Sequence, residues 1–194
     1  GDRLGVVWDD RLAEYDFGPG HPMAPIRVQL AMRLAAEFGL FQRTSVSILG
    51  PVEPAEEAAI LRVHEAEYVG AVRRASSDPH FYDALRGLGT EDDPVFPNMH
   101  QAASRVAAAS LMAAQAVHRG DVDHAVNLAG GLHHALPGAA EGFCVYNDIA
   151  VAIAWLLDQG KDASNESSMS KVICSEAYFR VADRCMQILG GLGI

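Results

Sequence analysis

The sequence predicts an α/β fold of three layers, with a parallel sheet between flanking helices. Short apolar runs alternate with longer stretches of helical periodicity, an order that is typical of parallel-sheet proteins. Clusters of glycine and proline separate these segments and mark the loops. The chain has 194 residues, of which 49% are hydrophobic, so it is long enough to bury a sizeable core.

The first half of the chain predicts two strands and two helical regions. Residues 4–8 form a short apolar run between polar neighbours, which indicates a buried strand, and residues 46–49 form a second strand candidate. Apolar residues recur at helical spacing over 26–40 and again over 56–74, where we expect a break near His64.

The second half predicts a long loop, two helices and a third strand. Residues 76–97 are polar and rich in glycine and proline, and a loop of that length is usually functional. Residues 99–119 form an alanine-rich helix that packs closely on the sheet. Residues 125–129 are interpreted as a central strand. Asp148 is expected to cap a helix over 149–157, which is apolar nearly all round and therefore buried on more than one side.

The acidic composition narrows the range of partners. The net charge is −10 and the isoelectric point is about 5.1, which disfavours direct binding to nucleic acid or to anionic membranes. No apolar run reaches the roughly 20 residues of a membrane span, and no signal peptide is visible. Cys144, Cys174 and Cys185 are odd in number and lack C-x-x-C spacing. We therefore expect reduced thiols in a cytoplasmic protein.

Two adjacent histidines follow the third predicted strand. Gly130 and Gly131 precede His133 and His134, and glycine lets the backbone turn sharply and approach a substrate. Ligands of open parallel sheets bind beyond the carboxyl ends of the strands. Neighbouring side chains of a strand point to opposite faces, so two imidazoles share a site only in irregular backbone. Such a pair can divide the roles of base and acid around an activated water. The alternative is that both are ordinary loop histidines.

Five sequence blocks surround this pair or precede it. They are Gly20-His21-Pro22-Met23-Ala24-Pro25-Ile26-Arg27, Val63-His64-Glu65-Ala66-Glu67-Tyr68, Gly89-Thr90-Glu91-Asp92-Asp93-Pro94-Val95-Phe96, Gly130-Gly131-Leu132-His133-His134-Ala135 and Gly142-Phe143-Cys144-Val145-Tyr146-Asn147-Asp148. In this order they resemble the histone deacetylase superfamily, and its bacterial acetoin-utilisation branch most of all. The resemblance covers about residues 3–160 and implies the arginase/deacetylase-like fold.

The resemblance implies roles for the matched residues. His133 and His134 would be the tandem histidines, acting as general base and as general acid and electrostatic partner to a zinc-bound water. Asp92 would be the rim carboxylate that holds the substrate backbone; alternatively, it caps a turn.

Three further matches concern the walls of the site. Gly142 and Phe143 would line the tunnel for an acyl-lysine, and Arg27 would lie beside an internal product channel. The alternatives are that Phe143 is a core residue and that Arg27 is a solvated helix residue.

The metal ligands of that family have no match in this sequence. The family holds its zinc with an Asp-x-His pair on the next strand and a later aspartate, and a more distant tyrosine polarises the acyl oxygen. No Asp-x-His pair follows residue 160 here. Because catalytic zinc usually has three protein ligands, we expect that the 194-residue chain neither binds zinc tightly nor deacetylates an acetyl-lysine reporter.

The last part of the chain has a different character. A helical stripe of apolar residues ends at two glycines; its members are Cys174, Tyr178, Val181, Cys185 and Ile188. Residues 161–194 resemble the C-terminal helical domain of acyl-CoA dehydrogenases, in which Gln187, Gly190 and Gly191 would contact flavin adenine dinucleotide (FAD). The alternative is an ordinary helix with a glycine stop. We therefore predict a deacetylase-like domain over 1–160 and a helix of different origin over 161–194, joined near 156–160.

Three functions follow from these patterns. On the first hypothesis, which the resemblance implies, the chain is the incomplete N-terminal part of a zinc-dependent deacetylase-like hydrolase, a family whose substrate is an acyl-lysine or a small acetylated amide. Alternatively, it is a non-catalytic chimera that self-associates through exposed apolar surface, for which an unpaired sheet edge is a template, or it has a flavin-linked role through residues 161–194. A natural fusion, a design and an artefact all remain open for the join.

Overall fold

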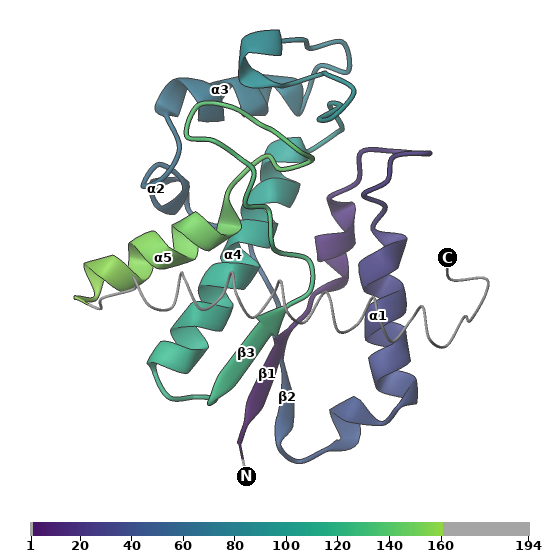
Figure 1. Ribbon diagram of the computed structural model, residues 1–194, viewed down its shortest axis with the longest axis vertical. Helices are drawn as coiled ribbons and strands as arrows, with labels where there is room; N and C mark the ends of the chain where they lie inside the picture. Colours follow the sequence, from purple (N-terminus) through teal and green to yellow (C-terminus); the bar gives the residue numbers. More distant parts are fainter. Residues whose placement is uncertain (1, 161–194) are drawn as a thin grey trace, which may run out of the picture. The chain divides into compact units, whose positions relative to one another are not determined.

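A three-stranded parallel sheet lies at the centre of the computed structural model, which describes residues 2–160 (Figure 1). β1 spans Leu4–Val7, β2 spans Val46–Leu49 and β3 spans His124–Asn127. The strand order is β2-β1-β3, and both neighbours of β1 run parallel to it. A parallel sheet with flanking helices confirms the predicted α/β class.

β1 is the central strand of this sheet. Its residues Val6 and Val7 are buried, whereas β3 begins at the exposed His124 and is otherwise half-buried. Within residues 2–160, β3 pairs with β1 alone. The prediction that 125–129 form the central strand is therefore wrong for the described sheet, because an apolar run indicates burial but not which strands lie beside it. The expected self-association depends on this edge of β3.

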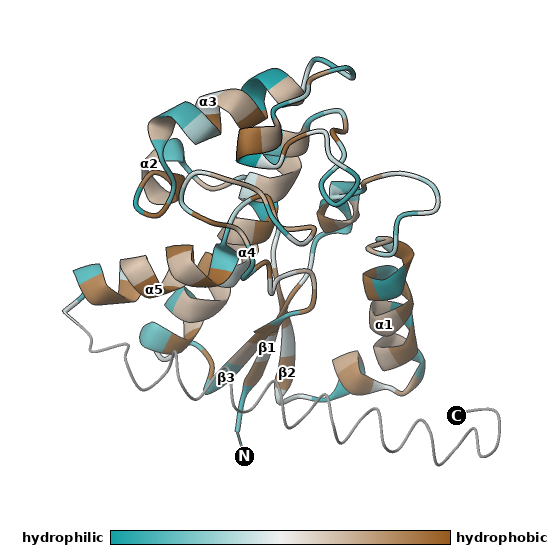
Figure 2. Cartoon of the chain, turned by 45° about the horizontal axis from the view of Figure 1, so that its top comes forward, coloured by the Kyte–Doolittle hydropathy of each residue, from teal (hydrophilic) through white to brown (hydrophobic). Residues whose placement is uncertain are grey.

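Helices cover the sheet on both sides. α1 (Ile26–Glu37) and α4 (Met99–His118) lie on opposite sides of it in Figures 1 and 2. α5 (Asp148–Asp158) runs beside α4, and α3 (Ala66–Ala75) packs on α4 after the short α2 (Glu57–Ile60). The break between α2 and α3 falls at the predicted place. The helix predicted over residues 161–194 lies outside the described residues.

Small side chains let α4 approach the sheet closely. α4 packs against β1 and β3, and the residues that it buries are mostly alanines. These alanines are Ala102, Ala103, Ala107, Ala109 and Ala116. The close packing predicted from the alanine-rich sequence is confirmed.

Apolar residues remain exposed on α1 and α5, and Figure 2 shows the apolar character of both helices. On α1 the exposed residues follow helical spacing, and Phe38 just beyond the helix is 78% exposed. The members of this stripe are Ile26, Leu30, Leu34 and Phe38. On α5 only Asp148, Val151 and Ala152 are buried. The expectation that α5 is buried on more than one side is therefore wrong within the described residues, whose core covers one side of the helix.

The connections contain three short 3₁₀ turns, at Asp10–Glu14, Leu40–Gln42 and Ala84–Arg86. The last of these lies in the long predicted loop 76–97, which has no other helix or strand. Among the residues that the structure describes, no helix has the length and apolar character needed to cross a membrane.

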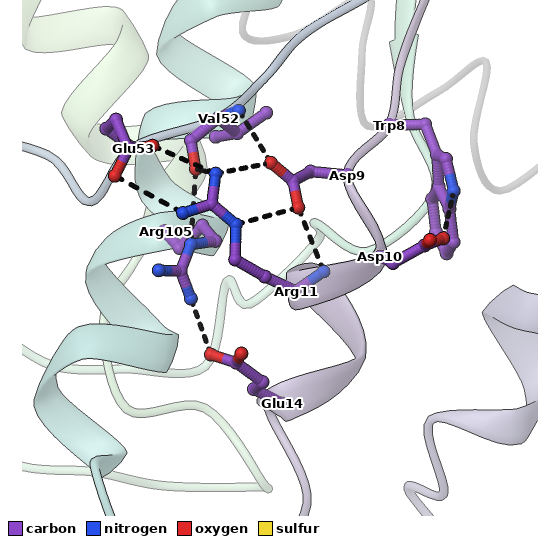
Figure 3. A network of polar contacts seen from close by, with 8 residues as sticks. All are labelled: Trp8, Asp9, Asp10, Arg11, Glu14, Val52, Glu53 and Arg105. Atoms are coloured by element: carbon purple, nitrogen blue, oxygen red, sulfur yellow. Dashed lines mark hydrogen bonds and ion pairs between the residues drawn. The ribbon is translucent and has the colours of Figure 1, made fainter.

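A network of charged side chains closes the carboxyl end of β1 (Figure 3). Asp9 accepts hydrogen bonds from the N–H groups of Arg11 and Val52, at 3.0 and 2.9 Å, and from Nη2 of Arg11 at 2.7 Å. Arg105 of α4 donates to the carbonyl of Val52 at 3.1 Å and to Glu14 at 2.6 Å. The Arg11 guanidinium above all holds the pKa of Asp9 well below its usual range. The network thus joins β1, α4 and the segment after β2.

We expect Asp9→Asn to lower the free energy of unfolding by about 1–3 kcal/mol at neutral pH, because hydrogen bonds to charged groups contribute about that much. The pKa of Asp9 is lower in the folded state than in the unfolded state. Its contribution is therefore present above about pH 4 and is lost as the pH falls towards the folded-state value. Denaturant unfolding should show a smaller deficit at pH 3 than at pH 7. Asp10→Asn is the control, and an equal deficit in that variant would contradict the prediction.

Candidate active site

The two predicted histidines lie side by side in a turn that follows β3. The ring centroids of His133 and His134 are 4.2 Å apart with an angle of 36° between the rings, and both residues are exposed. The expectation of irregular backbone is confirmed. Nδ1 of His133 lies 2.8 Å from the carbonyl oxygen of Gly131. Because a carbonyl only accepts, this contact places a proton on Nδ1 and leaves Nε2 of the neutral ring as an acceptor.

A buried carboxylate holds the backbone before the histidines. Asp148 is 1% exposed and accepts hydrogen bonds from the N–H of Leu132 at 2.7 Å and of Gly131 at 3.1 Å. The hydroxyl of Ser110 on α4 donates to the same carboxylate. Burial raises the pKa of Asp148, and these hydrogen bonds oppose the rise. One side chain of α5 therefore connects α4 to the histidine turn.

The position of Asp148 corrects one expectation from the sequence. Its neighbour Asn147 caps α5, because Oδ1 of Asn147 accepts a hydrogen bond from the N–H of Ala150 at 3.0 Å. Asp148 is the first helical residue, and its side chain is directed to the histidine turn. Asparagine and aspartate are both favoured N-caps, so their order in the sequence does not identify which one caps the helix.

The same contacts explain why Gly130 is a glycine. A Cβ atom there would lie 2.5 Å from Oδ2 of Asp148 and 2.8 Å from the hydroxyl oxygen of Ser110. Asn127 adds to the crowding, since its Nδ2 donates to that hydroxyl at 3.0 Å. The backbone thus approaches a polar cluster more closely than any side chain permits.

Gly142 and Phe143 form a tight turn against His134. The backbones of Glu141 and Cys144 exchange hydrogen bonds of 3.2 and 3.0 Å across it. Gly142 and Phe143 have φ angles of 56° and 69°, in the left-handed region. A Cβ atom on Gly142 would lie 3.1 Å from Cγ of His134, so the glycine backbone packs directly on that ring. The structure therefore places both predicted tunnel residues beside the histidine pair.

His21 connects Asp92 to the turn that contains Phe143. Nε2 of His21 lies 3.2 Å from the carbonyl oxygen of Asp92, and the His21 ring meets the Phe143 ring edge-on at 4.6 Å. The Asp92 side chain is exposed, and within residues 2–160 its carboxylate accepts no hydrogen bond. That geometry gives no support to the alternative that Asp92 caps a turn. Phe143 is half-buried at the edge of the core.

Arg27 lines a cavity of about 350 Å³ that Leu128 and Ala129, the residues between β3 and the histidine turn, also line. Gly130 and Tyr15 line it as well. The Tyr15 hydroxyl donates to the carbonyl of Phe143 at 2.9 Å and accepts from the N–H of Val145 at 3.0 Å, which fixes the wall between cavity and turn. Arg27 is exposed and belongs to α1, so it is both a helix residue and a cavity residue.

Sequence reasoning did not assign roles to several residues that build this site, among them His64. His64 is buried, its Nε2 accepts from the N–H of Asn147 at 3.0 Å, and its Nδ1 faces the carbonyl of Pro137 at 3.3 Å. Burial lowers its pKa, which favours the neutral ring that these contacts require. His64, His21 and Asp148 all lie in the quoted sequence blocks, but no spacing rule indicates which loop each one contacts.

A second buried carboxyl lies behind the Phe143 turn. Asp93 is 1% exposed, and its Oδ1 has no hydrogen-bond partner among the described residues. Burial above all, and then the nearby carboxylates of Asp92 and Glu141, raise the pKa of Asp93 to about 7. Cys144, which follows the turn, is also buried, and burial raises the pKa of its thiol to about 11.

The described residues do not fit a complete zinc centre. Within residues 2–160, no three His, Cys, Asp or Glu side chains are arranged to hold a metal ion. His133 and His134 are two imidazoles, whereas a catalytic zinc usually has three protein ligands. The residues predicted to contact FAD, Gln187, Gly190 and Gly191, lie outside the described residues.

The histone deacetylase domain family matches residues 21–170 of this chain. Histone deacetylase 2 of Oryza sativa subsp. japonica is 37% identical over 159 residues, which cover 80% of this chain and 31% of that protein. The acetoin utilization protein AcuC of Bacillus subtilis (strain 168) is 42% identical over 152 residues, which cover 77% of this chain and 38% of AcuC.

The fold is also similar to that of a solved structure. The crystal structure of an HDAC homolog from Aquifex aeolicus superimposes with a TM-score of 0.69 at 24% sequence identity, over 81% of this chain and 42% of that chain. The likeness supports a shared fold. The chain spans about a third to two-fifths of the length of these relatives.

We expect Asp148→Ala to lower the free energy of unfolding by about 2–4 kcal/mol, because each buried donor left without an acceptor costs about 1–3 kcal/mol. The donors concerned are the N–H groups of Gly131 and Leu132 and the hydroxyl of Ser110. The ring resonances of His133 and His134 in NMR spectra should shift as the turn loosens. Asp121→Ala removes an exposed carboxylate and serves as the control. Equal stability of the two variants, with unmoved histidine resonances, would show that Asp148 does not hold the turn.

The contribution of Asp93 to the free energy of unfolding changes with pH in the opposite direction to that of Asp9. Its folded-state pKa of about 7 lies above the usual value for aspartate, so the folded state holds the proton more tightly. The contribution of Asp93 to stability therefore falls as the pH rises from about 4 to about 7.

Asp93→Asn should remove this dependence. The stability of the variant relative to the natural chain should increase between about pH 5 and pH 7.5, as measured by denaturant unfolding. Asp92→Asn, a change of the exposed neighbour, should show less of this trend. A pH-independent difference for Asp93→Asn would contradict the raised pKa.

Proposed function

Because this chain belongs to the histone deacetylase domain family, we propose that it provides the tandem-histidine part of an amide hydrolase that removes acyl groups from acylated amines. The observation that carries the proposal is the paired rings of His133 and His134 at the end of β3. Acyl-lysine and small acetylated amides are the substrates that the family relationship favours.

The histidine turn supplies groups that move protons. Nε2 of His133 accepts a proton from the attacking water, because its Nδ1 is committed to the carbonyl of Gly131. His134, packed against Gly142, provides the acid and the electrostatic partner. When zinc is bound, it supplies a water of lowered pKa. The ligands for that zinc are not among the described residues, so no step of this proposal runs through the metal.

The neighbouring residues orient the substrate. We assign the exposed carboxylate of Asp92 to the backbone of the acylated substrate, and Gly142 and Phe143 to the walls around its acyl chain. Support comes from the contact of His21 with both Asp92 and Phe143, which keeps the rim and the wall together. Arg27 then lies on the cavity behind the histidine turn, where a released carboxylate product would meet a cation.

The division of the chain is part of the same proposal. Residues 1–160 carry the deacetylase-like domain and 161–194 a separate helical segment, with the join near 156–160. A flavin-linked function of that segment rests on sequence alone, and flavin absorbance of the purified chain tests it.

A domain exchange tests the proposed function. Residues 3–160 replace the matching part of the Bacillus subtilis AcuC, which supplies the remainder of the domain. We expect metal-dependent deacetylation of an acetyl-lysine reporter, reduced about 10²–10⁴-fold by His133→Ala or His134→Ala, the range typical of general acid–base groups. His80→Ala, a change of an exposed histidine outside the site, is the control.

Two outcomes would contradict the proposal. One is a folded exchange protein without activity, and the other is activity that is indifferent to both histidine substitutions. The 194-residue chain itself is expected to hold no stoichiometric zinc after dialysis and to show negligible turnover. Stoichiometric zinc that is lost in His134→Ala would overturn that expectation.

A further inference from the structure

Asn147 makes contacts with the histidine turn that the capping of α5 does not require. Its Nδ2 donates to the carbonyl of His133 at 3.3 Å and to the carbonyl of Ala135 at 3.2 Å. These two carbonyls flank His134 in the chain, so a single amide group spans that residue. The cap uses a different atom, because Oδ1 of Asn147 accepts from the N–H of Ala150. Asn147 therefore holds the backbone from which the second imidazole projects.

The chemistry of the amide distinguishes this clamp from a cap. Aspartate and serine cap helices about as well as asparagine does, but neither carries an NH₂ group with two donors. Both carbonyls that flank His134 receive a hydrogen bond from Nδ2 of Asn147. The next residue, Asp148, accepts from the N–H groups of Gly131 and Leu132. Two consecutive residues thus hold the turn, one through its N–H groups and the other through its carbonyls.

The buried ring of His64 fixes the backbone of Asn147 in turn. Its Nε2 accepts from the N–H of Asn147 at 3.0 Å, and its Nδ1 lies 3.3 Å from the carbonyl oxygen of Pro137. Because an N–H only donates and a carbonyl only accepts, both contacts exist together only in the neutral ring that carries its proton on Nδ1. A second proton, on Nε2, would set donor against donor. His64 therefore holds Asn147 only while its ring is neutral.

The surroundings of His64 favour this neutral form. The ring is 3% exposed and packs against the rings of Tyr68 and Tyr146, with centroids 5.6 and 5.1 Å away. Burial raises the pKa of both phenols, so neither is charged near neutral pH. The carboxylate of the next residue, Glu65, packs on the neighbouring loop, where a Cβ atom on Gly138 would lie 2.9 Å from its Oε2. Burial above all lowers the pKa of His64, and two backbone carbonyls oppose that shift.

We propose that Asn147 is a positioning residue for the histidine pair and that the neutral ring of His64 keeps Asn147 in place. This inference rests on the proposed function, because it concerns the acid and the base of that hydrolysis. Asn147 and His64 act through the backbone of the turn and not on the reacting atoms. A proton on His64 removes the acceptor for the N–H of Asn147, so the hold on His133 and His134 weakens in acid.

NMR spectroscopy of the 194-residue chain tests the clamp without any catalysis. Asn147→Ser keeps an oxygen that caps a helix but lacks the two amide donors. We expect the ring signals of His133 and His134 to move in this variant at neutral pH. Val151→Ala is the control for a general loss of stability, because it removes a buried side chain from α5 and leaves the amide of Asn147 in place. Unmoved ring signals in Asn147→Ser, or equal movement in Val151→Ala, would overturn the proposal.

Two variants of His64 separate its hydrogen bonds from its bulk. In the natural chain the backbone amide signal of Asn147 should shift together with the ring signals of His64 as the pH falls below about 6.5, the usual pKa of histidine. Glutamine offers an acceptor and a donor that do not titrate. His64→Gln should therefore abolish this step and keep the signals of His133 and His134 near their natural positions at neutral pH. His64→Phe, which has no acceptor, should move those signals at every pH.

Two results of this series count against the role of His64. One is an acid step of the Asn147 signal that persists in His64→Gln, and the other is a folded His64→Phe variant in which the signals of the histidine pair are unmoved.

The exchange protein built with the Bacillus subtilis AcuC supplies a catalytic readout. Asn147→Ser should lower kcat and kcat/KM equally, by about 10–10²-fold, because the loss of alignment weakens stabilisation of the transition state and not substrate binding. His64→Gln should retain a kcat close to that of the unsubstituted exchange protein. A loss confined to KM in Asn147→Ser, or an equal loss of kcat in Val151→Ala, would overturn the positioning role.

The two proposals fail separately. If the NMR signals respond as expected while the AcuC exchange protein is inactive, the clamp on the histidine turn stands and the deacetylase function does not. If the exchange protein is active but Asn147→Ser leaves both kcat and the ring signals unchanged, the deacetylase function stands and the positioning role does not.

Discussion

The buried carboxylate of Asp148 joins the three parts of the molecule on which the histidine site depends. The side chain belongs to α5. It accepts hydrogen bonds from the hydroxyl of Ser110 on α4 and from the N–H groups of Gly131 and Leu132 in the histidine turn. A carboxylate out of water is costly unless it is fully hydrogen-bonded. Asp148 receives all three hydrogen bonds only while α4, α5 and the histidine turn hold their relative positions. The orientation of the histidines thus follows from the packing of α4 and α5.

The short turn around Gly142 lies directly beside the histidine pair. The backbone of Gly142 lies on the ring of His134, and the backbones of Glu141 and Cys144 exchange hydrogen bonds across the turn. Both central residues of the turn, Gly142 and Phe143, have left-handed backbone angles, which makes the turn tight.

Local sequence patterns predicted where helices and strands lie along the chain, but not which other residues they contact. Apolar periodicity predicted α4 and the break between α2 and α3, since these depend on residues close in the chain. It did not predict that β1 is the central strand, or that Asn147 rather than Asp148 caps α5. Those outcomes depend on partners far away in sequence. The hydrogen bond between Asp148 and Leu132 is an example, because no local sequence pattern indicates that these two residues are in contact.

The sequence by itself determined the α/β class, the order of the elements and the positions of His133 and His134 at the end of a strand. These are properties of hydrophobic period, glycine placement and the family's motifs, which act over short stretches of chain. Only the tertiary structure decided that His21 links Asp92 to Phe143, that Asp148 holds the histidine turn, and that Asp93 is buried near Asp92 and Glu141. Such contacts arise when distant loops pack together, and their energies depend on burial that no local pattern records.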